Sequence, residues 1–438
     1  MSNLKKIVSE QHYRRSQQVG WPNYLEFVSG ATVDNIEVAQ QISEFVQRCQ
    51  DSYQRLIEKG LEATAGNQAG QRQVFFDKRF QGDTHCTVPW ETMSVGSEGT
   101  VTICMSPAWI PVSVGNVLTA DDIYTDILNS PSAQSIRNEI LQGRYYYCNN
   151  TLCRFFDHYD KKLYQQAPED IANIADFDAL APVTGNDTCV TQIPRNIIFD
   201  FDPTCNLRCP SCRFNVINYN KHPEFRANND NIAEKIKHLI IDNIGTQPIE
   251  IRWAGGEPFI SEVYLDLMDY IIATGRRNIR HVIQTNGSYL KKKQELVTKL
   301  LPFINELRIS FDAATAETYS RVRVNGQWDL LLENVRWVQD QIKQQGLKVR
   351  VKADFVVQLD NYQEIPQFRT LCNELGIKQI NFQRMWNWNT WPIEELDRRN
   401  VYNANHPLYP EVMRLLDSIG DSEGSILIED LGLKKDLT

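Results

Sequence analysis

The sequence predicts an α/β protein whose main domain is a partial barrel, and two observations support this. Strand and helix patterns alternate from residue 193 to about residue 386, as parallel strands with right-handed crossovers do. The alternation gives six strand–helix units, fewer than the eight of a closed barrel. The expected strands are 195–202, 248–253, 280–285, 306–311, 348–358 and 378–384, and the expected helices are 231–243, 261–274, 290–302, 329–345 and 362–375.

The composition of the chain changes on either side of this barrel. Apolar residues recur at helical spacing between Asn35 and Glu62. Short β-rich pieces (100–104 and 110–114) and a helical pattern (120–142) follow, which predict a small α+β domain. The expected division is a helical N-terminal segment (1–80), the small domain (81–160), a linker (161–192), the barrel core (193–391) and a helical tail (392–438).

Charge and hydropathy exclude several classes of protein. The 438 residues carry a formal net charge of −9, which argues against a non-specific nucleic-acid binder. No apolar run approaches the roughly 18 residues of a spanning helix, and the N-terminus lacks the apolar core of a signal peptide. The ten cysteines are grouped by spacing, which favours metal ligation in a reducing compartment. We expect a cytoplasmic protein with no nucleic-acid or membrane partner.

Three cysteines, Cys205, Cys209 and Cys212, lie in one short loop after the first expected strand. Three thiolates can hold three irons of a cubane cluster and leave a fourth iron open, whereas an electron-transfer cluster is closed by four cysteines. An open metal position is built to bind something else, as in catalytic zinc sites. Zinc is the competing interpretation, but it would need a fourth Cys or His nearby, and residues 213–220 contain neither.

The spacing of these cysteines, with three residues in the first gap and two in the second, resembles the cluster motif of the radical S-adenosylmethionine (radical SAM) superfamily. The core of that superfamily is a partial (β/α)6 barrel related to the TIM barrel. The resemblance implies an enzyme with a SAM-binding 4Fe–4S cluster that reductively cleaves SAM to a 5′-deoxyadenosyl radical. Cys205, Cys209 and Cys212 would be its metal ligands and catalytic residues. An external electron donor such as flavodoxin or ferredoxin is also implied.

Further motifs lie at the ends of the expected strands, where a barrel carries its chemistry. The Gly-Gly-Glu-Pro segment resembles the family's contact to the SAM ammonium: glycines admit close approach, and a glutamate pairs a cation. An arginine in a later loop suits the SAM carboxylate. The SAM-binding residues that the resemblance implies are Gly255, Gly256, Glu257, Asn286, Ser310, Asp312 and Arg321, with Arg323 as the alternative arginine. Ser211 departs from the family, which usually has an aromatic residue there, so the adenine contact must come partly from elsewhere.

Four further cysteines precede the barrel. The pattern Cys86-x12-Gly99-x4-Cys104 resembles the hairpin of the superfamily's auxiliary-cluster domains, called SPASM with two clusters and twitch with one. Cys148 and Cys153 complete four ligands, which suits a second, auxiliary 4Fe–4S cluster that exchanges an electron with the substrate. Zinc and simple buried thiols are the alternatives. Such a domain usually follows the barrel, and here it precedes it.

Polar and aromatic residues near the last strands are the candidates for substrate contact. Lys352 and Asp354 share one face of the fifth strand, and a polar face inside a barrel requires ligand or partners. Arg384 precedes a segment with three tryptophans (386–391), which either stacks on substrate or closes the barrel. We assign Lys352, Asp354 and Arg384 to the catalytic site.

Two enzymatic interpretations compete. One is modification of a ribosomally synthesised peptide by cross-linking, cleavage or epimerisation, with a separate leader-peptide-binding protein because residues 1–80 show no strand hairpin. The other is oxidation or epimerisation of a sugar, an aminoglycoside or another small metabolite. In an epimerase, Cys189 or Cys372 is a candidate hydrogen-atom donor. A non-enzymatic iron–sulfur protein is disfavoured, because a regulator would not need the glycine pair beside an open cluster.

Overall fold

The computed structural model describes residues 86–420, except 108, 111, 142–146, 148–186, 214, 387, 389 and 392, together with residues 426 and 427. The expected N-terminal segment, Cys148, Cys153 and most of the expected linker lie outside the described residues.

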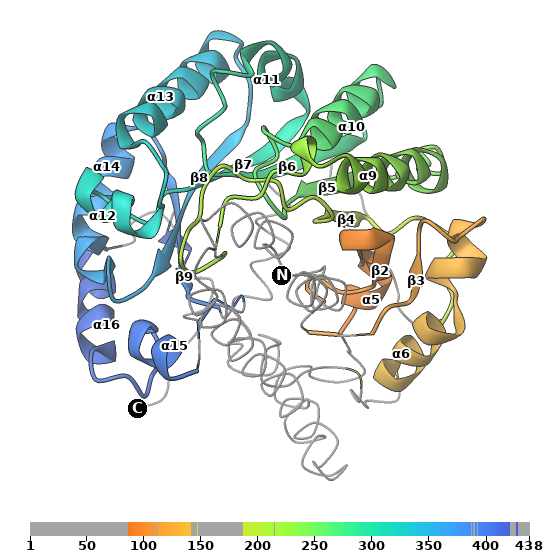
Figure 1. Cartoon of the computed structure of the whole chain (residues 1–438), viewed down its shortest axis with the longest axis horizontal. Coiled ribbons are helices and arrows are strands. Elements are labelled where there is room, and N and C mark those ends of the chain that lie inside the picture. The colour runs from red at the N-terminus through yellow and green to blue at the C-terminus, as the bar shows by residue number, and fades with distance from the viewer. Residues whose placement is uncertain are drawn as a thin grey trace, which may run out of the picture.

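The six predicted strands form one curved parallel sheet in sequence order (Figure 1). Each strand pairs in parallel with the next along the chain, so the partial barrel is confirmed. The predicted strand boundaries agree with the observed ones to within a few residues. The strands are β4 (Asn196–Phe199), β5 (Ile249–Trp253), β6 (Ile279–Thr285), β7 (Ile304–Ser310), β8 (Arg350–Val357) and β9 (Gln379–Arg384).

The crossover helices cover the outer face of this sheet (Figure 1). They are α9 (Pro223–Ile236) with its extension η4 (Lys237–Ile241), α10 (Glu262–Ala273), α11 (Gln294–Leu300) with η5 (Leu301–Phe303), α13 (Trp328–Gln344), and η6 (Tyr362–Glu364) with α14 (Ile365–Glu374). A short helix after β7, α12 (Ala316–Val322), was not predicted. The Thr315 side chain caps α12 by accepting from Thr318 N at 3.3 Å.

The region ahead of the barrel is built on a small hairpin. It contains α5 (Val88–Glu91), β1 (Thr92–Val95), η1 (Ser97–Gly99), β2 (Thr100–Thr102), β3 (Gly115–Asn116), η2 (Tyr124–Leu128) and α6 (Pro131–Leu141). The short η3 turn (Tyr219–Lys221) belongs to the barrel, where it lies between β4 and α9. Two expectations need correction. The described residues of 110–114 form no strand, because the ladder with β2 begins only at Gly115. The helical pattern at 120–142 is two helices, since Pro131 begins the second, where proline suits the first turn.

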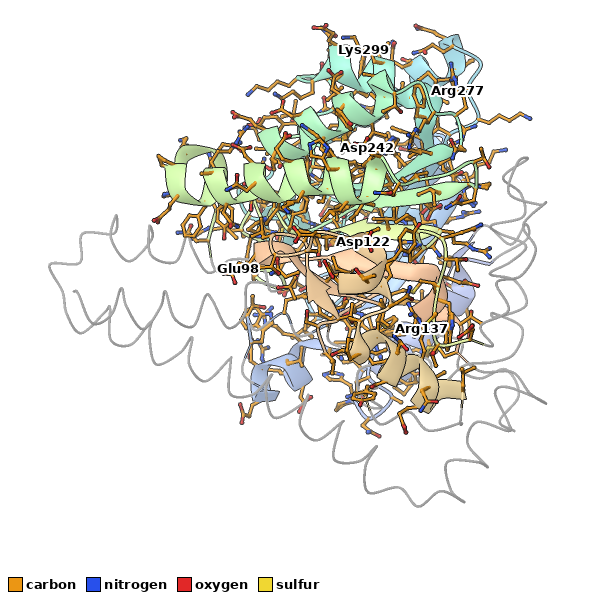
Figure 2. The ribbon with its side chains drawn as sticks, turned by 90° about the vertical axis from the view of Figure 1, so that its right-hand side faces the viewer. Glu98, Asp122, Arg137, Asp242, Arg277 and Lys299 are labelled. Carbon is orange, nitrogen blue, oxygen red and sulfur yellow. The ribbon has the colours of Figure 1, made fainter. Side chains whose placement is uncertain are left out.

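The hairpin continues the barrel sheet. β1 pairs in parallel with β4, with Val95 opposite Phe199, so the order of the sheet is β10-β9-β8-β7-β6-β5-β4-β1-β2-β3. Figure 2 shows α9 lying across the hairpin near Glu98, and Lys235 Nζ of α9 donates to Ala120 O at 2.9 Å. The Cys104 region is therefore attached directly to the first barrel strand.

The region after β9 contains α15 (Ile393–Arg399), α16 (Tyr409–Ser418) and β10 (Ile426–Leu427), which pairs with β9. Among the described residues, no helix is long and apolar enough to cross a membrane.

The two faces of the barrel sheet differ in chemistry. On β5, buried Ile249, Ile251 and Trp253 alternate with less buried Glu250 and Arg252. The Trp253 ring packs against aromatic rings of β4 and α10, with centroids 5.3 Å apart in each case. The apolar face thus anchors the helices, and the polar face is turned into the barrel.

Candidate active site

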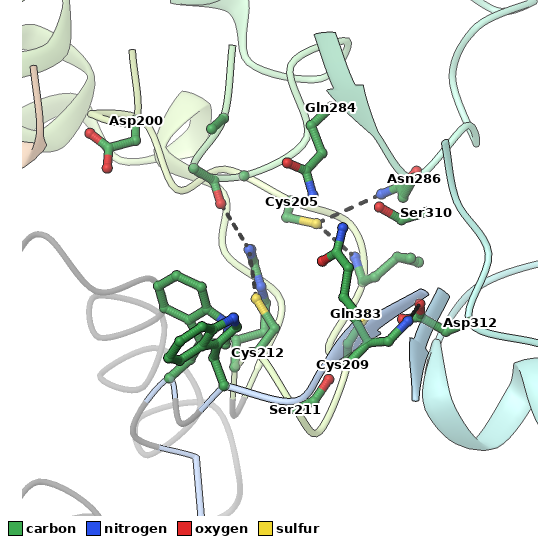
Figure 3. Close-up of a pocket in the computed structure, with 18 of the residues that line it drawn as sticks. Asp200, Cys205, Cys209, Ser211, Cys212, Gln284, Asn286, Ser310, Asp312 and Gln383 are labelled. Carbon is green, nitrogen blue, oxygen red and sulfur yellow. Dashed lines mark hydrogen bonds between the residues drawn. The ribbon is translucent and has the colours of Figure 1, made fainter. Parts of the chain in front are cut away.

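A cavity of about 360 Å³ lies at the carboxyl-terminal ends of the barrel strands (Figure 3). Residues that follow or end β4, β5, β6, β7, β8 and β9 all contribute to its walls. A further part of the wall comes from residues 105–107, directly after Cys104. The predicted site residues on its walls are Cys205, Cys209, Cys212, Gly255, Gly256, Asn286, Ser310, Asp312 and Arg384.

The three cysteines sit in a loop whose base is closed by a two-residue antiparallel bridge. Cys205 N donates to Ile217 O at 2.7 Å, and Ile217 N donates back to Cys205 O at 3.2 Å. Between these ends, Cys212 N and Arg213 N both donate to Cys209 O, which forms a tight turn. We call residues 205–213 the cysteine loop. Its backbone is thus ordered by its own hydrogen bonds.

Burial and mutual proximity act on the thiols of this loop. Burial, together with neighbouring cysteines, raises the pKa of Cys205. The same two causes raise the pKa of Cys209 to about 11. Among the described residues, no three cysteine, histidine or carboxylate side chains converge closely enough to hold a single metal ion. Separate thiols on one wall offer the ligand chemistry of a polynuclear cluster, in which each iron takes one protein sulfur.

Each sulfur of the loop accepts a side-chain N–H, and Figure 3 shows the bonds at Cys205 and Cys212. The donors and distances are Asn286 Nδ2 to Cys205 Sγ at 3.8 Å, Arg323 Nη1 to Cys209 Sγ at 3.7 Å, and Arg213 Nη2 to Cys212 Sγ at 3.6 Å. N–H donors of this kind stabilise the negative charge of thiolates that ligate iron. The residues present therefore fit a bound iron–sulfur cluster.

The glycine pair packs against the cysteine loop. Gly255 has a φ of +94°, and a Cβ there would lie 2.9 Å from Asp202 O. Glu257 N donates to Thr204 O at 2.7 Å, so the glycine segment is joined to the residue before Cys205. These glycines permit close approach to the backbone of residues 200–204, which lead into the cysteine loop.

The Glu257 carboxylate bonds to two residues of the cavity wall but does not line the cavity itself. It accepts hydrogen bonds from Thr285 Oγ1 at 2.7 Å, Asn286 N at 2.6 Å and Phe259 N at 3.2 Å. Burial raises its pKa to about 7, against the opposing effect of these hydrogen bonds. Glu257 does not line the cavity, so its contact with the SAM ammonium stays a prediction. Its hydrogen bond from the backbone of Asn286 is observed.

Asp312 and Arg323 form an ion pair on the opposite wall. Asp312 ends the β7 segment with a φ of +56°, and its carboxylate accepts from Val356 N at 2.7 Å and from Arg323 at 2.7 Å. Arg321, the arginine that we favoured, lies on α12 and pairs with Glu317 at 2.8 Å outside the cavity. Arg323 is therefore the arginine that reaches the cavity.

Lys352 and Asp354 lie in the barrel interior and are not on the cavity walls. Lys352 pairs with Glu306 at 3.5 Å. Although burial opposes it, this lysine and two neighbouring arginines lower the pKa of Glu306 to about 2. Asp354 accepts from Asn381 Nδ2 at 3.0 Å. Their expected contact with substrate stays a prediction, but both have partners within the protein.

The tryptophan segment divides between wall and packing. Arg384 lies on the cavity wall and stacks on the Trp386 ring at 4.1 Å. Trp388 is also on the wall, and its large apolar side chain is 40% exposed. Trp391 instead stacks with Arg399 at 4.4 Å and does not reach the cavity.

Three wall features were missed from the sequence. Asp200 directly follows β4, accepts from Ser94 Oγ of β1 at 3.5 Å, and has its pKa raised to about 7 by burial. Arg213 directly follows Cys212, which was its available signal. Residues 105–107 reach the wall through the pairing of β1 with β4, which no local pattern shows. Figure 3 places Asp200 and Asp312 on opposite sides of the cysteines.

The auxiliary cysteines are described in part. Burial and the nearby Cys104 thiol together raise the pKa of Cys86 to about 12, so the two thiols lie close to each other. Cys148 and Cys153 fall outside the described residues, and the four-ligand set stays a prediction. Cys189 is exposed and Cys372 is buried in α14, and neither lies on the cavity wall.

A cluster loop at the strand ends of a partial barrel defines the class of protein, and comparison with known families agrees. Residues 201–372 match the radical SAM superfamily, and residues 86–154 match the SPASM iron–sulfur cluster-binding domain. The chain therefore contains a radical SAM domain, with a SPASM-type domain ahead of it. The two matches imply a SAM-binding 4Fe–4S cluster, SAM and auxiliary iron–sulfur ligation.

Curated relatives are similar over part of the chain. A probable GTP 3′,8-cyclase of Saccharolobus islandicus (strain M.14.25 / Kamchatka #1) is 26% identical over 182 residues, covering 40% of this chain and 52% of the relative. The corresponding protein of Saccharolobus solfataricus is 24% identical over 180 residues, with the same coverage. The chain thus spans about half the length of the curated relatives it matches.

Solved structures are similar more distantly. Streptococcus suis SuiB bound to S-adenosylmethionine is 16% identical with a TM-score of 0.34, covering 59% of this chain and 48% of that chain. Kitasatospora setae TsrM with a tryptophan substrate and a SAM analogue is 12% identical with a TM-score of 0.36, covering 53% and 54%. Likeness at this level says nothing of the reaction.

Proposed function

We propose that this protein reductively cleaves SAM to a 5′-deoxyadenosyl radical and uses the radical to take a hydrogen atom from its substrate. The observation that supports this is the shared cavity. One hollow brings together the cysteine loop, the glycine pair, the strand-end motifs of β6 and β7, and the wall beside Cys104. A SAM molecule held there meets both the cluster ligands and a polar wall.

Different residues of the cavity would bind the cluster and SAM. The loop cysteines would hold the cluster, which when bound supplies the electron that splits the SAM sulfonium. Exposed backbone at Gly255 and Gly256 gives close-range acceptors and donors. Asn286, Ser310 and Asp312 contribute polar groups on the facing wall, and Arg323 fixes the Asp312 carboxylate. The walls also exclude water from a reactive intermediate.

A ribosomally synthesised peptide is the substrate class that we favour. The described walls enclose about 360 Å³, near the lower end for a site that holds one small ligand. SAM would fill much of the cavity, so the remaining space suits one side chain of a substrate and not a whole substrate molecule. The exposed indole of Trp388 at the cavity suits an apolar or aromatic side chain. A separate leader-peptide-binding protein and a flavodoxin- or ferredoxin-type donor are the expected partners.

A small metabolite is the second candidate. The same indoles would stack on a nucleobase or a sugar, and the curated relatives that match part of the chain are named as probable GTP 3′,8-cyclases. Oxidation or epimerisation of such a molecule would use the same radical and the same auxiliary ligation. A reducing, cytoplasmic location is part of either proposal, because both depend on reduced thiols.

Anaerobic turnover tests the shared part of the proposal. The reconstituted full-length chain should release 5′-deoxyadenosine with dithionite and SAM, and the variant with all three loop cysteines changed to Ala should not. A folded variant that still releases it would reject the assignment. Co-expression with short open reading frames adjacent to the gene, followed by mass spectrometry, then separates the substrates. An altered peptide supports the first candidate, and unaltered peptides with a nucleotide- or sugar-stimulated turnover support the second.

A further inference from the structure

Arg213 is a buried cation next to the third cysteine of the loop, and it is 4% exposed. Its guanidinium donates to Pro203 O at 2.9 Å, to Gly255 O at 3.3 Å and to Cys212 Sγ at 3.6 Å. These bonds join the entry of the loop, the glycine pair and a metal ligand. The guanidinium is thereby fixed at one place beside the cluster site.

The anionic neighbours of Arg213 are cysteines. Among the described residues, no Asp or Glu forms a salt bridge with it, and the three loop thiols act on its charge. A buried guanidinium is costly unless an anion accompanies it. The structure around Arg213 therefore requires negative charge at the cysteine loop, which thiolates bound to a cluster supply.

The other two N–H donors of the loop differ from Arg213. Arg323 also reaches a sulfur, but Asp312 balances its charge at 2.7 Å. Asn286, the donor to Cys205, is neutral. Arg213 is thus the donor of the three that adds uncompensated positive charge beside the cluster ligands.

We propose that Arg213 sets the reduction potential of the cluster held by the cysteine loop, as a positioning residue that stabilises the reduced state. This inference rests on the proposed function. Reduction adds one negative charge to the cluster, and a fixed cation that donates to a ligand sulfur favours the more negative state. Hydrogen bonding to cluster sulfurs and nearby charge are established controls on such potentials. Arg213 makes the cluster easier to reduce by a mild donor such as flavodoxin.

The test compares three variants of the full-length, anaerobically reconstituted chain. Arg213→Gln removes the charge and Arg213→Lys keeps it without the planar fork. Arg208→Gln makes the same charge change at an exposed position of the same loop. Redox titration followed by electron paramagnetic resonance gives each potential, and the signal that added SAM perturbs identifies the cluster of the loop. Iron content and thermal unfolding report structural damage separately.

Arg213→Gln should shift the reduction equilibrium at least about tenfold towards the oxidised cluster, which is 59 mV for a one-electron couple. Arg213→Lys should shift it in the same direction by less, and Arg208→Gln should leave it near that of the unaltered chain. Equal potentials in Arg213→Gln and Arg208→Gln, with iron retained in both, would overturn the proposal. If Arg213→Gln binds little iron, Arg213→Lys decides: an unchanged potential overturns the proposal and a lowered one supports it. An unaltered chain without a SAM-responsive cluster would instead reject the proposed function.

Discussion

Gly256 lies so close to Thr204 that a Cβ at Gly256 would come 2.1 Å from the Thr204 carbonyl oxygen. The neighbouring residue, Glu257, donates its backbone N–H to that same oxygen at 2.7 Å. Thr204 immediately precedes Cys205, so the end of β5 fixes the start of the cysteine loop. Glycine is needed here for the contact between two protein segments.

Gly256→Ala should therefore displace the entry of the cysteine loop. We expect the free energy of unfolding to fall by about 1–3 kcal/mol, the usual cost of overpacking, and the iron bound at the loop to fall with it. Urea unfolding and iron content per chain measure the two effects. Gly245→Ala is the matched control, since its Cβ would meet the end of the Gln247 side chain, which can move. Equal stability and iron content in both variants would contradict this account.

The sequence was sufficient for the barrel and for much of the site. Alternation of strand and helix patterns set the order of β4 to β9, because parallel strands with short crossovers leave few other topologies. Polar motifs at the strand ends then had to meet at one rim, which is why Asn286, Ser310 and the glycine pair lie on the cavity wall. Local spacing was informative wherever the backbone path was regular.

The sequence was insufficient where long-range pairing or side-chain direction decides. The pairing of β1 with β4 brings residues 105–107 to the cavity from about a hundred positions away in the chain. Arg321 pairs with Glu317 outside the cavity, and the Glu257 carboxylate already accepts a hydrogen bond from Thr285 within the protein. Such choices depend on which buried group needs a partner, and spacing does not encode that.

Cys104→Ala should impair the auxiliary cluster site and leave SAM cleavage at the cysteine loop intact. Cys104 lies beside Cys86 and directly before the cavity wall, and auxiliary ligation offers no open iron to SAM. We expect iron to fall from roughly eight to roughly four per chain, with 5′-deoxyadenosine release retained and product formation lost or diverted. Cys372→Ala, which removes a buried thiol far from the cavity wall, is the control for folding. Normal product from a folded, four-iron Cys104→Ala chain would reduce the domain to a structural role.

Glu257→Gln should weaken SAM binding while the cluster iron is kept. The carboxylate accepts the backbone N–H of Asn286, whereas a glutamine would present its NH2 group to one of the three donors around it. We expect a loss of roughly 1.5–3 kcal/mol in SAM affinity, the range for hydrogen bonds to a charged group. Isothermal titration of the reconstituted protein measures this, with Glu262→Gln, an exposed change at the start of α10, as control. Unchanged affinity in Glu257→Gln would reject any role in the SAM site.

Asp200→Asn should change how stability depends on pH. Burial raises the pKa of Asp200 from 3.8 to about 7, so the folded state binds its proton more tightly than the unfolded state. The group stabilises the fold below its unfolded pKa, and that contribution is lost as pH rises to about 7. Relative to the variant, the unaltered chain should lose roughly 1.4 kcal/mol for each pH unit between about pH 4 and pH 7, on the order of 4 kcal/mol in all, and no more above this window. Urea unfolding across this range checks it, with Asp269→Asn, an exposed change on α10, as the control.

The tryptophans after β9 offer an internal comparison that tests substrate contact. Trp388 is exposed at the cavity, whereas Trp391 packs on Arg399 away from it. Removing a stacking indole from a binding contact costs on the order of 1–3 kcal/mol. Trp388→Ala should therefore raise the dissociation constant of the substrate without changing SAM cleavage in its absence, and Trp391→Ala should lower stability without changing that constant. If the two variants raise the dissociation constant equally, the effect comes from the packing of the segment, and the cavity wall at Trp388 is not where the substrate rests.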